Sequence, residues 1–279
     1  MRVLVTGGDG QLGGALRAAL AGHDVWATGH TELDVADFPA VQALVDAIAP
    51  EVVVHAAAYT NVDGCERDPD LAYRVNALGT QNLALAAARV GADLVAVSTD
   101  YVFDGSKGEP YLEFDAPGPL SVYGRSKLAG ERLALALHRQ TYVVRTSWVF
   151  ARQSRNFVTT MLRLSETREE LTVVEDEWGS PTYAPDLADG IARLIETRRY
   201  GVYHLANEGG CSRFELAREA LRLAGRSCHV IPITAAEYAR QNPLVARRPA
   251  DSRLRNFAAS AALGISLRAW DEALADMLA

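Results

Sequence analysis

Short apolar segments alternate with longer segments of helical periodicity along the first half of the chain, and this alternation constrains the fold more than any other feature. The apolar segments are rich in valine and have no polar face, which is typical of strands in a parallel sheet covered on both sides. Repeats of strand, helix and strand require right-handed crossovers. The sequence therefore predicts an α/β fold built on a doubly wound, Rossmann-like parallel sheet. The predicted strands are residues 2–6, 24–28, 51–55, 92–98 and 141–147, and the predicted helices are residues 11–20, 38–48, 70–90 and 120–138.

The alternation becomes less regular after residue 150. The predicted strands there are residues 171–174 and 201–206, and the predicted helices are residues 156–168, 185–197, 213–224 and the last dozen residues. We expect residues 1–150, joined by about 171–206, to form a dinucleotide-binding domain. We expect residues 151–170 and 207–279 to form a smaller, mostly helical C-terminal lobe that binds substrate over the open edge of the sheet, where such sheets bind their ligands.

Composition narrows the classes of function. The chain of 279 residues has 28 basic and 35 acidic side chains and a net charge of −7. Nucleic-acid binding depends on clustered Lys and Arg, so this balance argues against it, although a local basic pocket for a phosphorylated small molecule remains compatible. Cys65, Cys211 and Cys228 form no CxxC pattern, which favours a reducing compartment over disulfides or a zinc site. No apolar run reaches the roughly 18 residues that span a bilayer, and no cationic leader is visible, so we expect a cytoplasmic protein without membrane contact.

A glycine-rich loop joins the first predicted strand to the first predicted helix. Gly7, Gly10 and Gly13 have the spacing GxxGxxG, and Gly8 also completes GxGxxG. Glycines there permit a tight turn and let backbone amides and the partial positive charge of the helix N-terminus approach a pyrophosphate. Turns collect glycine in any protein, but the strand-to-helix context favours dinucleotide binding. The residues predicted to bind the cofactor here are Gly7, Gly10, Gln11, Leu12 and Gly13.

The end of the second predicted strand bears on the choice of cofactor. An acid at this place would favour a free ribose 2′-hydroxyl, but the chain has Thr28, Gly29 and His30 there, with Glu32 slightly later. Small polar groups and a histidine can accommodate a 2′-phosphate. We therefore expect NADPH, with NADH as the alternative, although these residues are equally typical of an ordinary turn.

The loops after the second and third predicted strands supply further candidate contacts. Asp34 and Val35 are predicted beside the adenine, where the carboxylate of Asp34 can accept a hydrogen bond from the amino group; alternatively, Asp34 caps the helix at 38–48. Three small residues at the end of the third strand indicate a flat group passing close by, although alanine is also common at helix starts. These predicted cofactor contacts are Ala56, Ala57 and Ala58.

Three residues form a candidate catalytic group. Tyr123 and Lys127 lie four apart in a predicted helix and so share one face, and Thr99 ends the fourth predicted strand. A tyrosine has a reference pKa of about 10, and a neighbouring ammonium is expected to lower that pKa. A Tyr/Lys pair is usually a solvated helix face, but its combination with the glycine loop favours hydride transfer to a carbonyl. In that reaction Tyr123 supplies the proton, Thr99 an orienting hydrogen bond, and Lys127 the pKa shift and a contact to the nicotinamide ribose.

The glycine loop and the YxxxK pattern resemble those of the extended short-chain dehydrogenase/reductase superfamily. Five further stretches narrow the resemblance to the dTDP-4-dehydrorhamnose reductase family, and it runs through essentially the whole chain. These stretches are AAAYTNVD from Ala56, STDYVF from Ser98, VYGRSK from Val122, RTSWVF from Arg145 and RRPADSRL from Arg247. The resemblance implies reduction of the C4 ketone of dTDP-4-dehydro-6-deoxy-L-mannose to dTDP-L-rhamnose, with NADPH or NADH, by a monomer or homodimer.

The same resemblance implies roles for individual residues. Thr99, Tyr123 and Lys127 match the catalytic trio of the family. The positions that match residues facing the sugar are Thr60, Val62, Tyr101 and Trp148. An aromatic residue just past a strand can form the wall of a sugar pocket, although Trp148 is equally compatible with an ordinary core tryptophan.

Arg247, Arg248 and Arg253 form the only dense basic group in the second half of the chain. Guanidinium groups suit diphosphate oxygens, so we expect Arg248 or Arg253 to bind the nucleotide diphosphate, against the alternative of a solvated charged face. Some family members are thought to bridge subunits through acids on the first helix. This chain has Ala15 and Arg17 there, so we predict no metal site.

Other functions remain as alternatives. Related dehydratases carry a Glu two residues after the catalytic Thr, whereas Thr99 is followed here by Asp100 and Tyr101, which disfavours dehydration. An epimerase would have to keep its NAD and reduce its own intermediate. A 4-ketoreductase for another dTDP-deoxysugar and a non-catalytic NADP-binding regulatory subunit, similar to that of eukaryotic methionine adenosyltransferase, are the other candidates.

Overall fold

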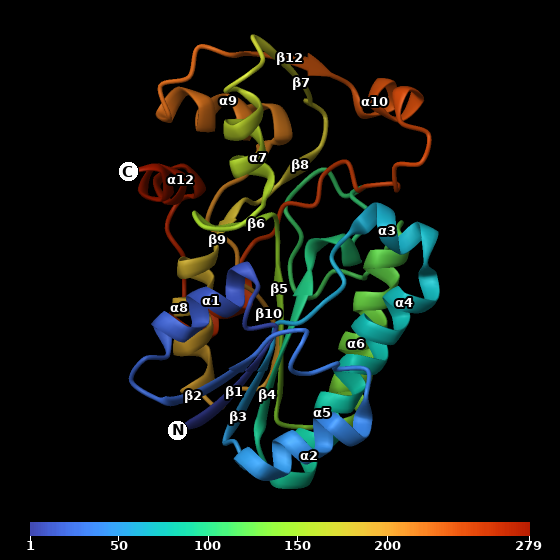
Figure 1. Cartoon of the computed structure of the whole chain (residues 1–279), viewed down its shortest axis with the longest axis vertical. Helices are drawn as coiled ribbons and strands as arrows, with labels where there is room; N and C mark the ends of the chain where they lie inside the picture. The colour runs from blue at the N-terminus through green and yellow to red at the C-terminus, as the bar shows by residue number, and fades with distance from the viewer.

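Six parallel strands form the central sheet in the order β10-β5-β4-β3-β1-β2 (Figure 1). The computed structural model describes residues 1–279. The strands are β1 (Arg2–Thr6), β2 (Asp24–Thr28), β3 (Val52–His55), β4 (Asp93–Thr99), β5 (Thr141–Thr146) and β10 (Gly201–His204). The chain leaves β1 toward β2 on one side and continues from β3 toward β10 on the other. The strand order therefore reverses between β1 and β3, which is where doubly wound sheets bind ligands. The predicted fold class is confirmed.

Helices cover both faces of this sheet, as the valine-rich strands require. One face carries α1 (Gln11–Ala19), α8 (Ala184–Ile195) and α11 (Phe257–Leu263), and the other carries α2 (Phe38–Ile48), α5 (Gly79–Val90) and α6 (Val122–Leu137). Each layer has its own continuous apolar core against the strands. The strand β3 is buried along its whole length, which explains its unbroken run of valines.

The single helix predicted over residues 70–90 was wrong in its detail. The chain instead forms α3 (Val62–Arg67), α4 (Pro69–Tyr73), a π-helical turn at Arg74–Leu78 and then α5. Asn76, inside the π-helical turn, exchanges hydrogen bonds with the backbone of Tyr59 and donates to the hydroxyl of Ser126. Its carbonyl also lies so close to Gly130 of α6 that a side chain there would collide with it. These contacts with distant residues stabilise a wider turn than helical periodicity predicts.

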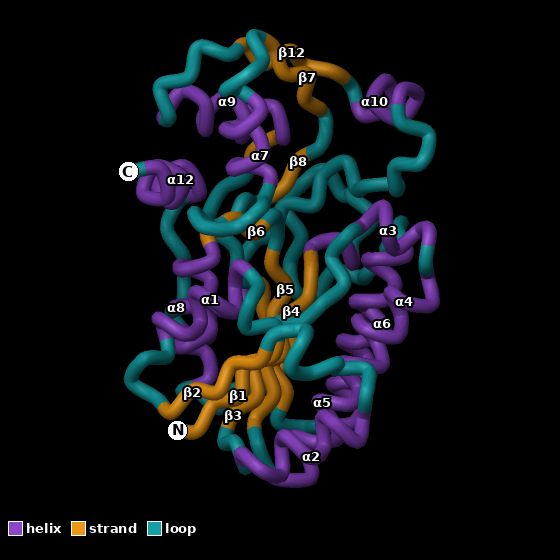
Figure 2. Tube along the Cα trace, viewed as in Figure 1, coloured by secondary structure: helices purple, strands orange, loops and turns teal.

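The upper region of the molecule is built from shorter pieces (Figure 2). Its helices are α7 (Phe157–Leu164), α9 (Arg213–Leu223), α10 (Ala235–Gln241) and α12 (Trp270–Leu278), and its strands are β6 (Val149–Phe150), β7 (Glu170–Val174), β8 (Trp178–Gly179), β9 (Thr182–Tyr183), β11 (Cys211–Ser212) and β12 (His229–Ile233). Segment 171–206 is divided: β7 pairs with β12 in this region, while α8 and β10 return to the central sheet. The division into two domains stays a prediction. None of the helices combines the length and apolar character needed to cross a bilayer.

Candidate active site

The glycine loop lies where the strand order reverses, against the end of β3. Gly7 has a φ of +74°, and a Cβ there would lie 2.7 Å from the amide nitrogen of Ala57, so both the backbone angle and the space require glycine. Gly10 precedes α1 and offers no side-chain cap, and the amides of Gln11 and Leu12 donate to no group of the chain. Unpaired amides at the positive end of a nine-residue helix fit a pyrophosphate. The arrangement fits the dinucleotide predicted from the sequence.

The other predicted cofactor residues surround this loop. The backbone of Ala56 and Ala57 touches Gly7, and Ala58 follows in the same half-buried segment. Gly13 packs directly on the carbonyl of Gly7, which holds α1 close to the sheet.

Asp34 and Val35 follow in the loop after β2. Asp34 is exposed, and its carboxylate accepts a hydrogen bond from the amide of Ala36. The cap of α2 is Asp37, so the alternative that Asp34 caps this helix was wrong. Val35 is buried beneath the loop. The side chain of Asp34 is therefore accessible and that of Val35 is not, and contact of either residue with the adenine stays a prediction.

Thr99, Tyr123 and Lys127 lie together at the ends of β4 and α6. The hydroxyl of Thr99 lies beside Tyr123 and acts on the pKa of its phenol, and the ring of Tyr101 packs edge-on against Tyr123 with centroids 5.8 Å apart. Lys127 is only 5% exposed and donates from Nζ to the carbonyl of Val97 at 2.6 Å. The structure therefore brings the three predicted catalytic residues to one place beside the switch point of the sheet.

The expected electrostatics of Tyr123 were wrong in sign. Burial raises the pKa of Tyr123 above its ordinary value, and the hydrogen bond with Thr99 offsets only part of that effect. Burial also lowers the pKa of Lys127 to about 8, against the opposing charge of Glu131. The phenol of Tyr123 is therefore protonated at neutral pH, as a proton donor must be, although its raised pKa makes it a weaker acid than an ordinary tyrosine.

A buried network supports the catalytic residues from below. Glu131 lies one turn after Lys127 on α6 and accepts a forked pair of hydrogen bonds from Arg145, with its Oε2 2.8 Å from Nη2. Glu131 also accepts the hydroxyl of Ser98, the residue before Thr99. A buried ion pair of this kind fixes the ends of α6, β4 and β5 relative to one another.

Asp100 connects this network to the upper region. It is 2% exposed and accepts hydrogen bonds from the hydroxyls of Thr99 at 3.0 Å and Ser252 at 2.6 Å. Burial raises the pKa of Asp100, and these hydrogen bonds lower it in part. Ser252 thereby holds the segment around the basic group to the end of β4.

The predicted sugar-facing residues lie on separate segments of the chain, and their contact with a sugar stays a prediction. Thr60 is exposed, Val62 begins α3, and Tyr101 is nearly buried beneath the cleft. Trp148 is half-buried with a φ of +46°, rare for a large side chain, and its ring is held between Gly179 and the guanidinium of Arg213. Trp148 also packs against the core of the upper region, so both interpretations of this residue stay open.

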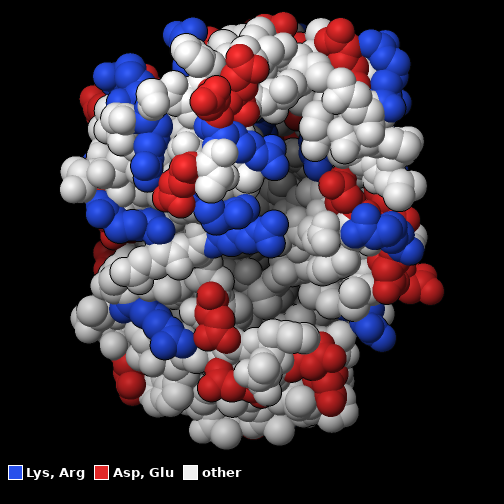
Figure 3. Space-filling model, turned by 45° about the horizontal axis from the view of Figure 1, so that its top comes forward, with Lys and Arg blue, Asp and Glu red and all other residues white.

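The two predicted diphosphate-binding arginines have different surroundings. Arg248 lies 3.2 Å from Asp63 of α3, and its charge acts on Tyr101 and Glu177 in the cleft. Figure 3 shows this face of the molecule, where basic side chains gather along the upper edge of a hollow between the two regions.

The side chains of Ser252 and Arg253 point to opposite sides of their segment, because side chains alternate along extended backbone. Its guanidinium is paired with Asp251 at 2.6 Å, and it lines a separate cavity of about 540 Å³ with Gly210 and Phe257. Arg248 therefore acts on Tyr101, which packs against Tyr123, whereas Arg253 borders another cavity. Which of the two arginines binds a diphosphate stays a prediction.

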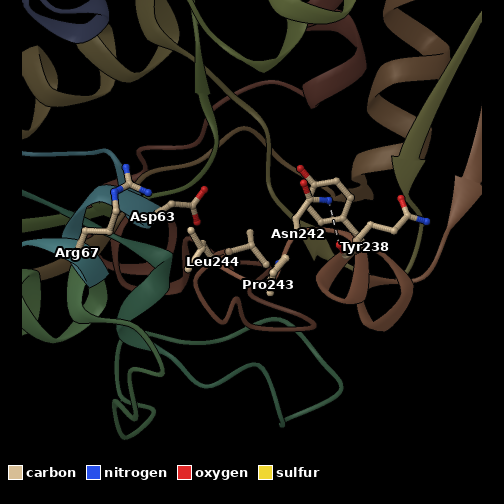
Figure 4. A pocket seen from close by; sticks show the side chains of 8 residues that line it. Asp63, Arg67, Tyr238, Asn242, Pro243 and Leu244 are labelled. Atoms are coloured by element: carbon tan, nitrogen blue, oxygen red, sulfur yellow. Dashed lines mark hydrogen bonds between the residues drawn. The ribbon is translucent and has the colours of Figure 1, made fainter.

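A groove of about 350 Å³ continues beyond Arg248 (Figure 4). Asp63 and Arg67 of α3 border it on one side, and Tyr238 and Asn242 border it on the other, with Leu244 between them. Asp63 also accepts the amide of Ala246. The groove therefore extends the cleft along the boundary of the two regions.

Several residues of this site were not predicted from the sequence. Arg213, Glu177, Asp100, Ser252 and Glu131 reach it from five separate segments. The Ser-x-x-Glu pattern at Ser212 and Glu215 signals the start of α9, and both form its capping box, but it does not reveal which way Arg213 points.

Comparisons with known proteins agree with this geometry. The model of the family described as "RmlD substrate binding domain" matches residues 1–279. A dTDP-4-dehydrorhamnose reductase of Aggregatibacter actinomycetemcomitans is 39% identical, covering 100% of this chain and 98% of that protein. A spore coat polysaccharide biosynthesis protein, SpsK, of Bacillus subtilis is 41% identical, covering 99% of this chain and 96% of that protein.

Solved structures give the same result. The crystal structure of dTDP-4-dehydrorhamnose reductase from Bacillus anthracis in complex with NADP has a TM-score of 0.95 and 41% identity, covering 99% of this chain and 98% of that one. A UDP-glucose 4-epimerase from Thermus thermophilus in complex with NAD, at 24% identity and a TM-score of 0.83, covers 100% of this chain and 98% of that one and shares the fold.

Proposed function

This chain belongs to the RmlD family, that of the dTDP-4-dehydrorhamnose reductases, and we propose from that premise that its cleft reduces the C4 ketone of dTDP-4-dehydro-6-deoxy-L-mannose to dTDP-L-rhamnose. It is an oxidoreductase that uses a nicotinamide cofactor. The observation that carries the assignment is the juxtaposition of Thr99 and Tyr123, with Lys127 one turn away on α6, beside a glycine loop with unpaired helix amides.

The residues of the chain divide the work of the reaction. When bound, the cofactor supplies a hydride to the carbonyl carbon. Tyr123 is protonated at neutral pH and donates its phenolic proton to the carbonyl oxygen. Thr99 orients the same oxygen by a hydrogen bond. Lys127 lies one turn along α6, where its ammonium stabilises the negative charge that forms on Tyr123 and contacts the nicotinamide ribose.

The cofactor is proposed to lie along the glycine loop, with its pyrophosphate on the amides of Gln11 and Leu12. NADPH and NADH supply the same hydride, so the reaction itself does not distinguish between them. Two carboxylates, Asp9 and Glu32, lie against Gly29 at the end of β2, and Arg17 reaches the neighbouring carbonyl of Ala27. The two carboxylates favour a free ribose 2′-hydroxyl, whereas Arg17 and the NADP bound by the Bacillus anthracis relative favour a 2′-phosphate. We propose NADPH as the reductant, with NADH as the competitor in a direct comparison.

The substrate is proposed to lie across the cleft, with its sugar at the sugar-facing residues predicted from the sequence and its diphosphate at Arg248. Arg253 is left out of the substrate site, because it is paired with Asp251 beside another cavity. We propose a cytoplasmic protein that acts as a monomer or homodimer. The sugar-facing residues are Thr60, Val62, Tyr101 and Trp148.

The test is turnover of purified protein with dTDP-4-dehydro-6-deoxy-L-mannose and either NADPH or NADH, followed by identification of the sugar product. The proposal requires cofactor oxidation that is stoichiometric with dTDP-L-rhamnose. A reduced product of different stereochemistry would indicate a reductase for another deoxysugar. Cofactor binding without oxidation would favour the regulatory subunit.

A further inference from the structure

Arg213 is a cation without a partner of its own in the cleft. It is the first residue of α9, and its guanidinium lies 3.5 Å from the ring centroid of Trp148 and 5.1 Å from that of Phe157. Its side chain is half-buried and forms neither a hydrogen bond nor an ion pair with another residue of the chain. Because a desolvated charge without a partner is costly, such an arginine is expected to serve a ligand.

The charge of Arg213 reaches three groups of the cleft. Burial raises the pKa of Asp100, Tyr101 and Glu177, and the charge of Arg213 partly offsets this effect in each. None of them neutralises the arginine: Asp100 is occupied by Thr99 and Ser252, Tyr101 is an uncharged phenol, and the carboxylate of Glu177 makes no ion pair.

Arg248 acts on two of the same groups. Its charge also reaches Tyr101 and Glu177, so both guanidinium groups lie near these two side chains. Arg248 is anchored by Asp63 of α3, and Arg213 by the ring of Trp148. Two guanidinium groups of the upper region, each held by a different neighbour, are suited to a ligand that carries two negative charges.

We propose that Arg213 and Arg248 together bind the diphosphate of the substrate, and that Trp148 and Phe157 hold Arg213 in the orientation that this requires. The proposal rests on the proposed function for the identity of the ligand. Stacking on an aromatic ring leaves the edge of a guanidinium free to donate, and it reduces the freedom lost when a phosphate binds. The same stack orients Trp148 at the sugar end of the cleft.

The experiment measures binding of thymidine, dTMP and dTDP by calorimetry, without turnover. In Arg213→Gln the affinity for dTDP should fall about tenfold to a hundredfold, the affinity for dTMP less, and the affinity for thymidine scarcely, because the lost contacts are to phosphate. Arg248→Gln should give the same graded pattern. Arg247→Gln removes an exposed neighbouring charge and should leave all three affinities unchanged.

Three outcomes separate the explanations. An equal loss for all three ligands in Arg213→Gln would mean that Arg213 only supports Trp148, and it would overturn the proposal. An unchanged affinity for dTDP would overturn it as well. Failure of the unaltered protein to bind dTDP would instead overturn the proposed function. The affinity for NADPH, measured in each variant, should stay unchanged and shows that the variant is folded.

Discussion

The two regions on either side of the cleft are stabilised in different ways. The sheet region has apolar cores of 20 and 14 buried residues on its two faces, whereas the largest core in the upper region has 8. The upper region also relies on two-residue strands and on a two-stranded sheet. The residues proposed for chemistry stand on the first region, and Arg213 and Arg248 stand on the second. The reaction geometry is thus fixed by extensive packing, and ligand selection is left to segments that depend on a few polar contacts.

The largest expected effect is a loss of turnover when a proposed catalytic residue of the sheet region is replaced. Tyr123→Phe removes the proton donor but keeps the ring against Tyr101, so turnover should fall about a hundredfold to ten-thousandfold. The affinity for NADPH should stay the same, as measured by fluorescence titration. A variant that loses cofactor affinity but keeps its turnover per bound complex would contradict the role given to Tyr123.

The buried ion pair gives the next largest effect and compares the two regions directly. Glu131→Gln leaves Arg145 buried without its carboxylate, and the free energy of unfolding should fall by about 3–5 kcal/mol. The matched control is Glu219→Gln in α9, which breaks an exposed pair with Arg222 and should cost less than about 1 kcal/mol. Urea unfolding measures both. Similar costs in the two variants would show that the sheet region does not depend on this pair.

The glycine loop gives a smaller effect on both stability and binding. Gly7→Ala places a methyl group against Ala57 at a positive φ, and we expect a loss of about 1–3 kcal/mol together with weaker NADPH binding. Gly14→Ala, where no atom lies within 4 Å of the new Cβ, should instead stabilise the protein by about 0.5–1 kcal/mol. Thermal unfolding and NADPH titration of the two variants check this. If Gly7→Ala and Gly14→Ala had the same stability and the same affinity for NADPH, the glycine loop would tolerate a side chain at Gly7.

The smallest expected effect is a pH dependence from Lys127. Because burial lowers its pKa to about 8, the folded protein loses this charge as pH rises through 8, while the unfolded chain keeps it until about 10.5. Turnover that needs the ammonium should therefore fall up to about tenfold per pH unit above 8. Over the same range the contribution of Lys127 to the free energy of unfolding should increase.

The control for this pH dependence is Lys127→Met. As pH rises above 8, the free energy of unfolding of the unaltered protein should increase relative to that of Lys127→Met. Neither this increase nor the fall in turnover above pH 8 should occur in the variant. Tyr123 keeps its proton over this range because its pKa is raised, so it does not account for the fall in turnover. Parallel profiles of stability in the two proteins would show that Lys127 stays charged.

Local patterns predicted the sheet region well, because its strands and helices follow from apolar periodicity and from glycines with a fixed geometric role. The same reasoning failed where contacts between residues far apart in the sequence determine the local structure. The π-helical turn depends on hydrogen bonds from Asn76 to Tyr59 and Ser126. The strand β12 was missed because Pro232 is atypical of a strand and most of its side chains are exposed.

The candidate site was predicted in part for the same reason. The spacing of Tyr123 and Lys127 reveals that they share a helix face, but it does not reveal burial, and burial reverses the expected pKa shift of the phenol. Arg248 and Arg253 look alike in the sequence. Only the fold shows that one of them pairs across the cleft with Asp63 and the other with its neighbour Asp251. Arg213 was missed because its stacking partner Trp148 lies on another segment.

The central claim is that the cleft delivers one hydride to C4 of the sugar and one proton from Tyr123 to its oxygen. The most direct test is a single-turnover reaction with NADPH deuterated at the transferred position, with the product analysed by NMR. One deuterium should appear at C4 of dTDP-L-rhamnose, and its transfer should be greatly slowed in Tyr123→Phe. A product that carries no deuterium, or deuterium that returns to the cofactor, would contradict the central claim.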